Sequence, residues 1–424
     1  MSMKRRTFLA GLAAVPFAGT LASCGLSGNT ASNSSAGGQV TGEITFQTWS
    51  LKPKYTDYVN GVIDAFQKQH QGTTVKWVDQ PADGYLAKVM ADASAGSLPD
   101  VINVPPDLSF PLAKAGQLVD LDQALEEAKP EYLENAWQAF EIPGKGGCYG
   151  FPWYLNTGPV FYNKALFRDA GLDPEKPPTT FKELEEQALK LAQSKKIAML
   201  GQTPTIADFG LYGVKVFEND KFTFNEPEGV EFVESYKRMY DAGALIPEAL
   251  TQNYTGSGTK FMAQQTALSP GSAYDLGKFK TDAPSLYANI GITKPITNTG
   301  SANMFLHGVS VPKSSKNQAT ALAFGRFVTN AENQVKFAKL ASIFPSTSKG
   351  GDDPYFTTED GSDEARVRVA AAKQLKTAVN YTPVQFSDQM REALLQQLAD
   401  AMLGKKSAKQ ALDDAVNECN RLLK

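Results

Sequence analysis

The sequence predicts an α/β protein that divides into two lobes. A chain of 424 residues is too long for one hydrophobic core, so two compact parts are expected. Short β-branched segments alternate with helical periodicity near the start of the chain, which favours a mostly parallel sheet flanked by helices in each lobe. The end of the chain has a purely helical pattern, which predicts C-terminal helices on the second lobe.

The first elements follow a strand, helix, strand order. Ile44, Phe46 and Thr48 alternate with polar residues, as in a half-buried strand, and apolar residues then recur at helical spacing over 55–66. A strand at 75–77 and a helix over 85–93, which ends at Gly96, come next. A short β-branched strand at 101–104, bounded by prolines, completes the first part of the predicted sheet.

Later segments predict helices from their caps and stripes. Thr180 and Glu183 have the spacing of a capping box, which predicts that a helix begins there. Pro227 and Gly243 have the positions of a helix start and a helix end. The last two predicted helices carry apolar stripes, made by Met390, Leu394, Leu398 and Met402 in one and by Ala408, Leu412, Val416, Cys419 and Leu423 in the other.

The N-terminus has the pattern of an export signal. Lys4, Arg5 and Arg6 precede an uncharged run over 8–21, as in a secretory signal peptide. Arg5 and Arg6 also resemble the twin-arginine signal, while the flanking Lys4 and Ala10 fit it imperfectly. The twin-arginine route is favoured, and the general route stays open. We therefore expect an extracytoplasmic protein.

Residues 21–24, Leu-Ala-Ser-Cys, resemble the lipobox of bacterial lipoproteins. The resemblance implies cleavage after residue 23, acylation of Cys24 and attachment to the outer face of the cell membrane or in the periplasm. An ordinary signal with an incidental cysteine is the alternative. Residues 24–42 are rich in Ser, Gly, Asn and Ala, which predicts a flexible tether.

The charge of the mature chain limits its possible partners, and its cysteine content bears on disulfide pairing. Without Lys4, Arg5 and Arg6, 39 basic residues remain against 45 acidic ones, a formal charge of about −6. This balance disfavours nucleic acid. Cys148 and Cys419 show no framework spacing, so their pairing cannot be read from the sequence, and we expect two free thiols. No interior stretch has the 18 apolar residues of a membrane span.

Motifs for common catalytic chemistry are absent from the sequence. His70 and His307 are the two histidines, and neither has a second histidine at zinc-site spacing, which disfavours a metal site. Nucleophile elbows, phosphate-binding loops and dinucleotide turns are also missing, so we expect neither cofactor nor catalysis. Paired carboxylates remain possible among 45 acidic residues, which keeps an exported glycan-active enzyme open as an alternative.

Aromatic residues beside turns and short polar side chains favour a carbohydrate site. Such groups occur at 49–50, 151–156, 271–274 and 344–346. A pyranose ring has an apolar C–H face that stacks on an aromatic ring, and hydroxyls that need polar partners. Any one of these aromatic residues is more often part of a core, so it is their grouping beside turns that favours sugar binding.

Several ordered motifs resemble family 1 extracellular solute-binding proteins, of which maltose-binding protein is an example. In the first half they are Trp49, residues 85–88, 96–101 and 115–121. Further along they are residues 149–152, 161–164, 170–173, 178–181 and 308–317. The likeness covers nearly everything after Gly42.

The resemblance implies a two-lobed, periplasmic-binding-protein-like clamp of class II. Lobe 1 would comprise 43–155 and 304–348, and lobe 2 would comprise 156–303 and 349–424. The solute would be enclosed between the lobes, and the clamp, a monomer, would deliver it to the permease of an ABC importer. A mono- or oligosaccharide is the favoured ligand; the same clamp binding glycerol phosphodiesters or a polyol is the alternative.

The resemblance also implies which residues contact the ligand. Those carried over directly are Trp49, Tyr85, Asp107, Tyr154 and Asn156. Ser272, Ala273 and Tyr274 match a loop that commonly presents a stacking tryptophan, which is replaced here, with Tyr274 as the nearest substitute. His307 replaces a residue that is usually small and is expected in the cleft or at the hinge. Phe344 and Phe386 are further candidates, for which core packing is the stronger expectation.

Overall fold

The computed structural model of the protein describes residues 38–52, 54–195, 197–251, 254–271 and 273–423. For residues 195, 254–256, 273 and 274 it describes the backbone only. The predicted signal segment 1–23, the lipidation site Cys24, most of the tether and Ser272 lie outside these ranges. Within them, no helix combines the length and the apolar character that crossing a bilayer requires.

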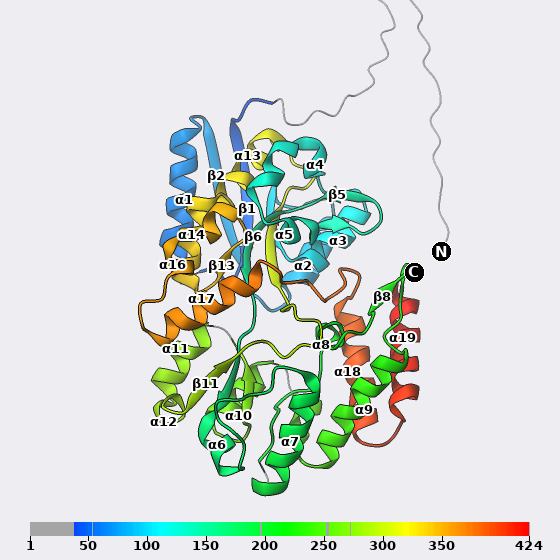
Figure 1. Ribbon diagram of the computed structural model, residues 1–424. Helices are drawn as coiled ribbons and strands as arrows, with labels where there is room; N and C mark the ends of the chain where they lie inside the picture. Colours follow the sequence, from blue (N-terminus) through cyan, green and yellow to red (C-terminus); the bar gives the residue numbers. More distant parts are fainter. Residues whose placement is uncertain (1–37, 53, 196, 252–253, 272, 424) are drawn as a thin grey trace, which may run out of the picture. The chain divides into compact units, whose positions relative to one another are not determined.

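A six-stranded sheet combines strands from the start of the described chain with strands from much later in it (Figure 1). Its strand order is β13-β6-β12-β3-β1-β2. The strands are β1 (Gly42–Trp49), β2 (Thr73–Gln80), β3 (Val101–Val104), β6 (Phe151–Asn156), β12 (Phe305–Ser310) and β13 (Phe344–Pro345). The strands predicted at 44–48, 75–77 and 101–104 are therefore confirmed as β1, β2 and β3.

The strand directions correct the prediction of a mostly parallel sheet. β1 is parallel to β2 and to β3. β12 is antiparallel to β3 and to β6, and β13 is antiparallel to β6. The parallel part consists of the strands joined by helices, as expected. The antiparallel part consists of strands whose partners lie some 150 or more residues away in sequence, which the local pattern does not reveal.

Helices cover both faces of this sheet. α1 (Thr56–Gln69), α13 (Gln318–Val328) and α14 (Ala331–Ala341) contribute to a core that contains Phe46 and Trp153. α2 (Tyr85–Ser94) and α3 (Pro106–Lys114) contribute to a smaller core on the opposite face. Val101 belongs to the first cluster and its neighbour Ile102 to the second, as the alternation of side chains along a strand requires.

A three-stranded sheet organises a second part of the chain. Its order is β10-β7-β11, and both pairings are antiparallel. The strands are β7 (Val160–Asn163), β10 (Leu268–Pro270) and β11 (Ile290–Thr293). The helices that follow or separate these strands are α6 (Lys164–Asp169), α7 (Phe181–Lys195), α8 (Ile206–Tyr212), α9 (Pro227–Asp241), α10 (Tyr254–Met262), α11 (Ala273–Asp282), α12 (Pro284–Tyr287), α18 (Asp388–Met402) and α19 (Ala408–Leu422).

The remaining elements are short, apart from one helix. They are β4 (Glu141–Ile142), β5 (Gly146–Cys148), β8 (Phe217–Glu218), β9 (Lys221–Phe222), α4 (Leu121–Ala124), α5 (Glu134–Gln138), α15 (Ser348–Gly351), α16 (Pro354–Thr357) and α17 (Asp363–Leu375), with 3₁₀ turns η2 (Glu126–Glu131) and η3 (Pro247–Leu250). Cys148 and Cys419 are both buried free thiols, which confirms the expectation for this pair. Burial raises the pKa of Cys419 to about 12.

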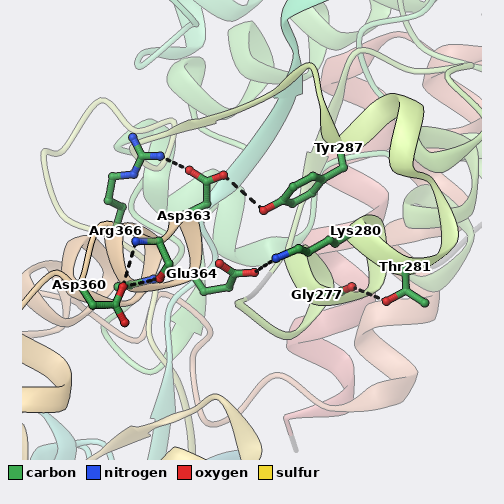
Figure 2. A network of polar contacts seen from close by, with 10 residues as sticks. Gly277, Lys280, Thr281, Tyr287, Asp360, Asp363, Glu364 and Arg366 are labelled. Atoms are coloured by element: carbon green, nitrogen blue, oxygen red, sulfur yellow. Dashed lines mark hydrogen bonds and ion pairs between the residues drawn. The ribbon is translucent and has the colours of Figure 1, made fainter.

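Helix α17 packs against two different cores. Val367, near its start, belongs to a cluster with Phe279 and Leu286 of α11 and α12. Ala371 and Leu375, near its end, belong to the main core of the six-stranded sheet. Figure 2 shows polar contacts at the start of this helix, where Glu364 accepts from Lys280 and Asp363 accepts from the Tyr287 hydroxyl at 3.3 Å.

Three connections join the parts of the chain that build the two sheets. They lie between β6 and β7, between β11 and β12, and between α17 and α18. The second connection pairs with the third through backbone hydrogen bonds: the Val379 amide donates to the Ala302 carbonyl, and the Met304 amide donates to the Val379 carbonyl. The division into lobes at residues 155, 303 and 348 stays a prediction; the packing of α17 favours a later boundary than 348.

Candidate functional site

Four ring side chains meet near the ends of β1, β6 and β12. The imidazole of His307 stacks on the Tyr154 ring, with centroids 5.1 Å apart and an interplanar angle of 18°. Its other neighbour is Trp49, at 5.2 Å and 36°. Trp49 in turn stacks on Tyr85, at 5.6 Å and 19°. Four of the residues that the sequence suggested for the site therefore lie together, and we call them the ring cluster.

Strand register positions the ring cluster. His307 on β12 lies opposite Tyr154 on β6, and two residues away Phe305 lies opposite Asn156. The register shifts between His307 and Gly308. A Cβ atom at Gly308 would lie 2.3 Å from Cζ of Phe140, so the close approach of β12 to this ring requires glycine.

Helix α2 supplies the fourth ring. Tyr85 is the first residue of this helix and is 1% exposed, and its hydroxyl donates to the Asn103 carbonyl at 2.8 Å. Trp49 is the last residue of β1 and is half-buried. The rings are therefore fixed on regular elements, with Trp49 and Tyr154 only partly covered.

The ring cluster carries no charge at neutral pH. Burial lowers the pKa of His307 from 6.5 to about 4, so its imidazole is neutral. Burial also raises the pKa values of Tyr85 and Tyr154 far above neutrality. Nδ1 of His307 is buried without a hydrogen-bond partner among the described residues. An uncharged surface of this kind suits the apolar face of a ligand.

A charged group lies beside Asp107. This residue is half-buried in the first turn of α3, and burial raises the pKa of its carboxyl, while the nearby Arg391 opposes that rise and Asp388 reinforces it. Arg391 itself forms an ion pair with Asp388 in the first turn of α18. The carboxylates of Asp107 and Asp388 therefore accompany the guanidinium of Arg391, and these three residues together carry no net positive charge.

A cavity of about 900 Å³ adjoins the three-stranded sheet. Residues that line it include Asn156, Asn303, Phe305 and Arg391, together with residues of α7, α8, β10 and α18. Phe305 is 57% exposed, so its ring is accessible to a ligand in the cavity. The volume falls within the range of small-molecule binding sites.

The ring cluster and the cavity share two strands. Tyr154 and His307 belong to the cluster, and two residues along each strand Asn156 and Phe305 line the cavity. Side chains two apart on a strand point to the same face, so the cluster and the cavity edge form one continuous surface. We call this surface the candidate site.

The candidate site contains part of the predicted set. Among the predicted residues whose side chains the structure describes, Asn156 is the one that lines the cavity itself. Phe344 packs against Phe356 and Phe386 packs against Phe222, each in a hydrophobic core. Core packing was the stronger expectation for both residues. Ser272 lies outside the described residues, as do the side chains of Ala273 and Tyr274, although both belong to α11.

Sequence reasoning missed most of the residues that line the cavity, among them Phe305 and Arg391. No strand was predicted around His307; such a prediction would have pointed to Phe305, because residues two apart on a strand share a face. Arg391 follows Met390, a residue of the apolar stripe of α18, and its sequence context predicts only a charged side chain on the solvent-exposed face of the helix. No local signal marks it as a cavity residue.

Comparisons with known proteins give a consistent result. A model of the family described as bacterial extracellular solute-binding protein matches residues 52–335. The chain is 25% identical over 413 residues to a maltooligosaccharide ABC transporter solute-binding lipoprotein of Streptococcus pneumoniae, with 90% of each chain covered. It is 24% identical over 434 residues to the sn-glycerol-3-phosphate-binding periplasmic protein UgpB of Pectobacterium atrosepticum, covering 92% of this chain and 93% of that one.

A solved structure is also similar over most of its length. It belongs to a protein of Synechococcus sp. MITs9220 that has been assigned as an oligosaccharide periplasmic-binding protein. The two chains are 28% identical, with a TM-score of 0.80 over 90% of this chain and 98% of the other. The chain therefore has the α/β fold of periplasmic-binding proteins.

Proposed function

We propose, from the premise that this chain belongs to the family of bacterial extracellular solute-binding proteins, that it captures a mono- or oligosaccharide for an ABC importer. The family places the chain outside the cytoplasm. The observation that carries the proposal is the uncharged ring cluster beside a cavity lined by the amide groups of Asn156 and Asn303. Rings stack on the C–H face of a pyranose, and amides pair with its hydroxyls.

The mechanism requires two half-sites on one solute. Both predicted lobes would contact the ligand in the closed state. The ligand therefore binds the closed state more tightly than the open state, and this difference in affinity favours closure. The permease would recognise that state, and other subunits of the importer would hydrolyse ATP. The three connections between the two sheets supply the segments about which such a movement occurs.

The finer features of location belong to the same proposal. Cleavage before Cys24 would leave a lipid-anchored monomer on the outer face of the membrane, joined by the tether 24–42. The description of the Streptococcus pneumoniae relative as a lipoprotein supports this arrangement. Export by the twin-arginine route would follow from Arg5 and Arg6.

Glycerol phosphodiesters are the second candidate ligand, and the similarity to a protein named for binding sn-glycerol-3-phosphate supports a ligand of the glycerol phosphate class. Phosphate binding calls for cations or helix N-terminal amides that face the ligand. Among the described residues that line the cavity, Arg391 is the one cation, and it is paired with Asp388. The charge of the candidate site therefore favours a neutral sugar.

Calorimetry of the chain without residues 1–24 tests the ligand class. A panel of neutral glycans, polyols and glycerophosphodiesters would be titrated, and heat is expected with a neutral glycan. Heat with glycerophosphodiesters alone would replace the sugar proposal by the second candidate. Incubation with the bound glycan tests the enzyme alternative, because a binding protein returns its ligand unchanged.

Phe305 provides a mutational test of the candidate site. We expect Phe305→Ala to weaken glycan binding by about tenfold, since an aromatic stacking partner contributes on the order of 1 kcal/mol beyond the area it covers. The melting temperature should hardly change, because the ring is 57% exposed. Leu340→Ala is the matched control, with the same exposure on α14 outside the cavity. Equal effects of the two substitutions would contradict the proposed site.

A further inference from the structure

The edge of the cavity differs chemically from its interior. Phe305 and Arg391 are exposed, and Asn156 and Gln202 are half-buried, so these residues mark the side that solvent reaches. Most of them bear amide or guanidinium groups, which can pair with hydroxyls. A sugar fits this edge, in the manner proposed above.

The interior is lined by aliphatic side chains. Leu184, Leu200, Ile206, Leu211, Leu268 and Leu394 all line the cavity, and each is between 1% and 9% exposed. All six belong to one hydrophobic core cluster. Leu200 precedes α8, and the other five lie on α7, α8, β10 and α18. The floor of the cavity is therefore the core itself.

Polar residues interrupt this aliphatic lining at the buried Thr203, Tyr236, Ser257 and Asn303 and at the half-buried Asp208 and Asp275. The Asp208 carboxylate accepts hydrogen bonds from N and Oγ1 of Thr205, both at 2.7 Å, which commits it to the cap of α8. Burial, reinforced by Asp208, raises the pKa of Tyr236, which stays neutral. Ser257 is 1% exposed, and its Oγ has no hydrogen-bond partner among the described residues.

A sugar ring in this interior would be poorly satisfied. Each ring carries several hydroxyls, and a buried hydroxyl without a partner is unfavourable. The buried part of the lining offers Tyr236, Thr203, Asn303 and the Ser257 hydroxyl, which is unpaired among the described residues, beside the six aliphatic side chains. An alkyl or aryl group, in contrast, gains from every apolar contact with the six aliphatic residues.

From this division we infer that the natural ligand is a glycoside with an apolar aglycone. The sugar lies at the cavity edge beside Phe305 and Asn156, and the aglycone enters the interior that Leu211 and Leu394 help to line. Ser257 can receive one hydrogen-bonding group at the end of that aglycone. The inference rests on the proposed function and specifies the substrate class of the same site.

Alkyl glycosides of increasing length test the inference on the chain without residues 1–24. Methyl, butyl and hexyl glucosides and maltosides of both anomers would be titrated by calorimetry, below their micellar concentrations. We expect the dissociation constant to fall by about fourfold for each buried methylene. Methyl glycosides should bind most weakly.

Two substitutions at one position test where the alkyl chain lies. Leu395 is half-buried on α18 and lines the cavity, so Leu395→Asn adds polarity and Leu395→Trp fills space with little threat to folding. Both should abolish the dependence on chain length, whatever their effect on the affinity for the methyl glycoside. Leu403→Asn, at an exposed residue that follows α18 and does not line the cavity, should leave the whole series unchanged.

Failure of this inference differs from failure of the proposed function. Equal affinity for methyl and hexyl glycosides, or tighter binding of longer free oligosaccharides, would overturn the apolar aglycone and leave sugar binding intact. Absence of binding for every sugar of the panel would overturn the proposed function, and the aglycone with it.

Discussion

The imidazole of His307 is a neutral group held between Trp49 and Tyr154. In the unfolded chain it takes up a proton as the pH falls through 6.5, whereas in the folded chain it does so only near its lowered pKa of about 4. The unfolded state therefore binds more protons between these values. We expect the free energy of unfolding to decrease as the pH falls through this window, by up to about 3 kcal/mol from this residue.

Urea denaturation at several pH values measures this effect. His307→Phe keeps a ring in the cluster and removes the titrating group, so its stability should change less between pH values of about 7 and 4. His70→Phe is the control, because it removes the other histidine, which contacts Phe66 outside the ring cluster. Parallel losses in wild type and His307→Phe would show that another residue carries the dependence.

Trp49 tests the ring cluster as a binding surface. Trp49→Leu removes the half-buried ring that lies between His307 and Tyr85, and we expect glycan affinity to fall by about tenfold or more. Trp77→Leu removes another half-buried tryptophan on the adjacent strand β2 and should leave affinity unchanged. Titration calorimetry of both variants with the same glycan decides between a binding role and a packing role.

Residue-level reasoning predicted the ring cluster better than the cavity. Trp49, Tyr85, Tyr154 and His307 stand beside strand ends or turns, and family resemblance placed all four. Phe305 was missed because no strand was predicted there, and because a strand pattern does not say which face of a sheet stays uncovered. That depends on packing partners from distant segments, here residues 200–205 and α18.

Helix α17 allows packing and surface charge to be separated within one element. Leu375 is 3% exposed in the core of the six-stranded sheet, so Leu375→Ala should cost about 2–5 kcal/mol. The Lys280 to Glu364 pair is exposed, and Lys280→Ala should cost less than about 1 kcal/mol. Urea denaturation measures both; a larger effect of Lys280→Ala would mean that the contacts in Figure 2 control the position of this helix.

Elements were predictable where local chemistry defines them. The predicted capping box is confirmed, since the Glu183 amide donates to Oγ1 of Thr180 and the Thr180 amide donates to the Glu183 carboxylate, each at 3.2 Å. The stripe of Met390, Leu394, Leu398 and Met402 is buried as expected. Strand direction was mispredicted because β12 enters the sheet from far along the chain, and no local pattern records its orientation.

For the whole molecule, ligand binding should raise stability. A ligand that binds only the folded chain stabilises it by about 2.7 kcal/mol at one hundred times its dissociation constant. Because strands of both sheets line the cavity that adjoins the candidate site, we expect glycan to shift the entire thermal transition of the chain without residues 1–24. Scanning calorimetry with and without the bound glycan measures the shift; an unchanged transition at saturating glycan would argue against binding to the folded state.

The three connections between the sheets have a practical consequence for proteolysis. A single cut between β11 and β12 would leave the fragments joined through their shared cores, since β12 pairs with β3 and β6 while β11 pairs with β7. The nicked chain would elute from a sizing column as an intact molecule and come apart only in denaturant. Its two pieces could then be labelled separately and recombined, so that a probe on each reports on ligand capture.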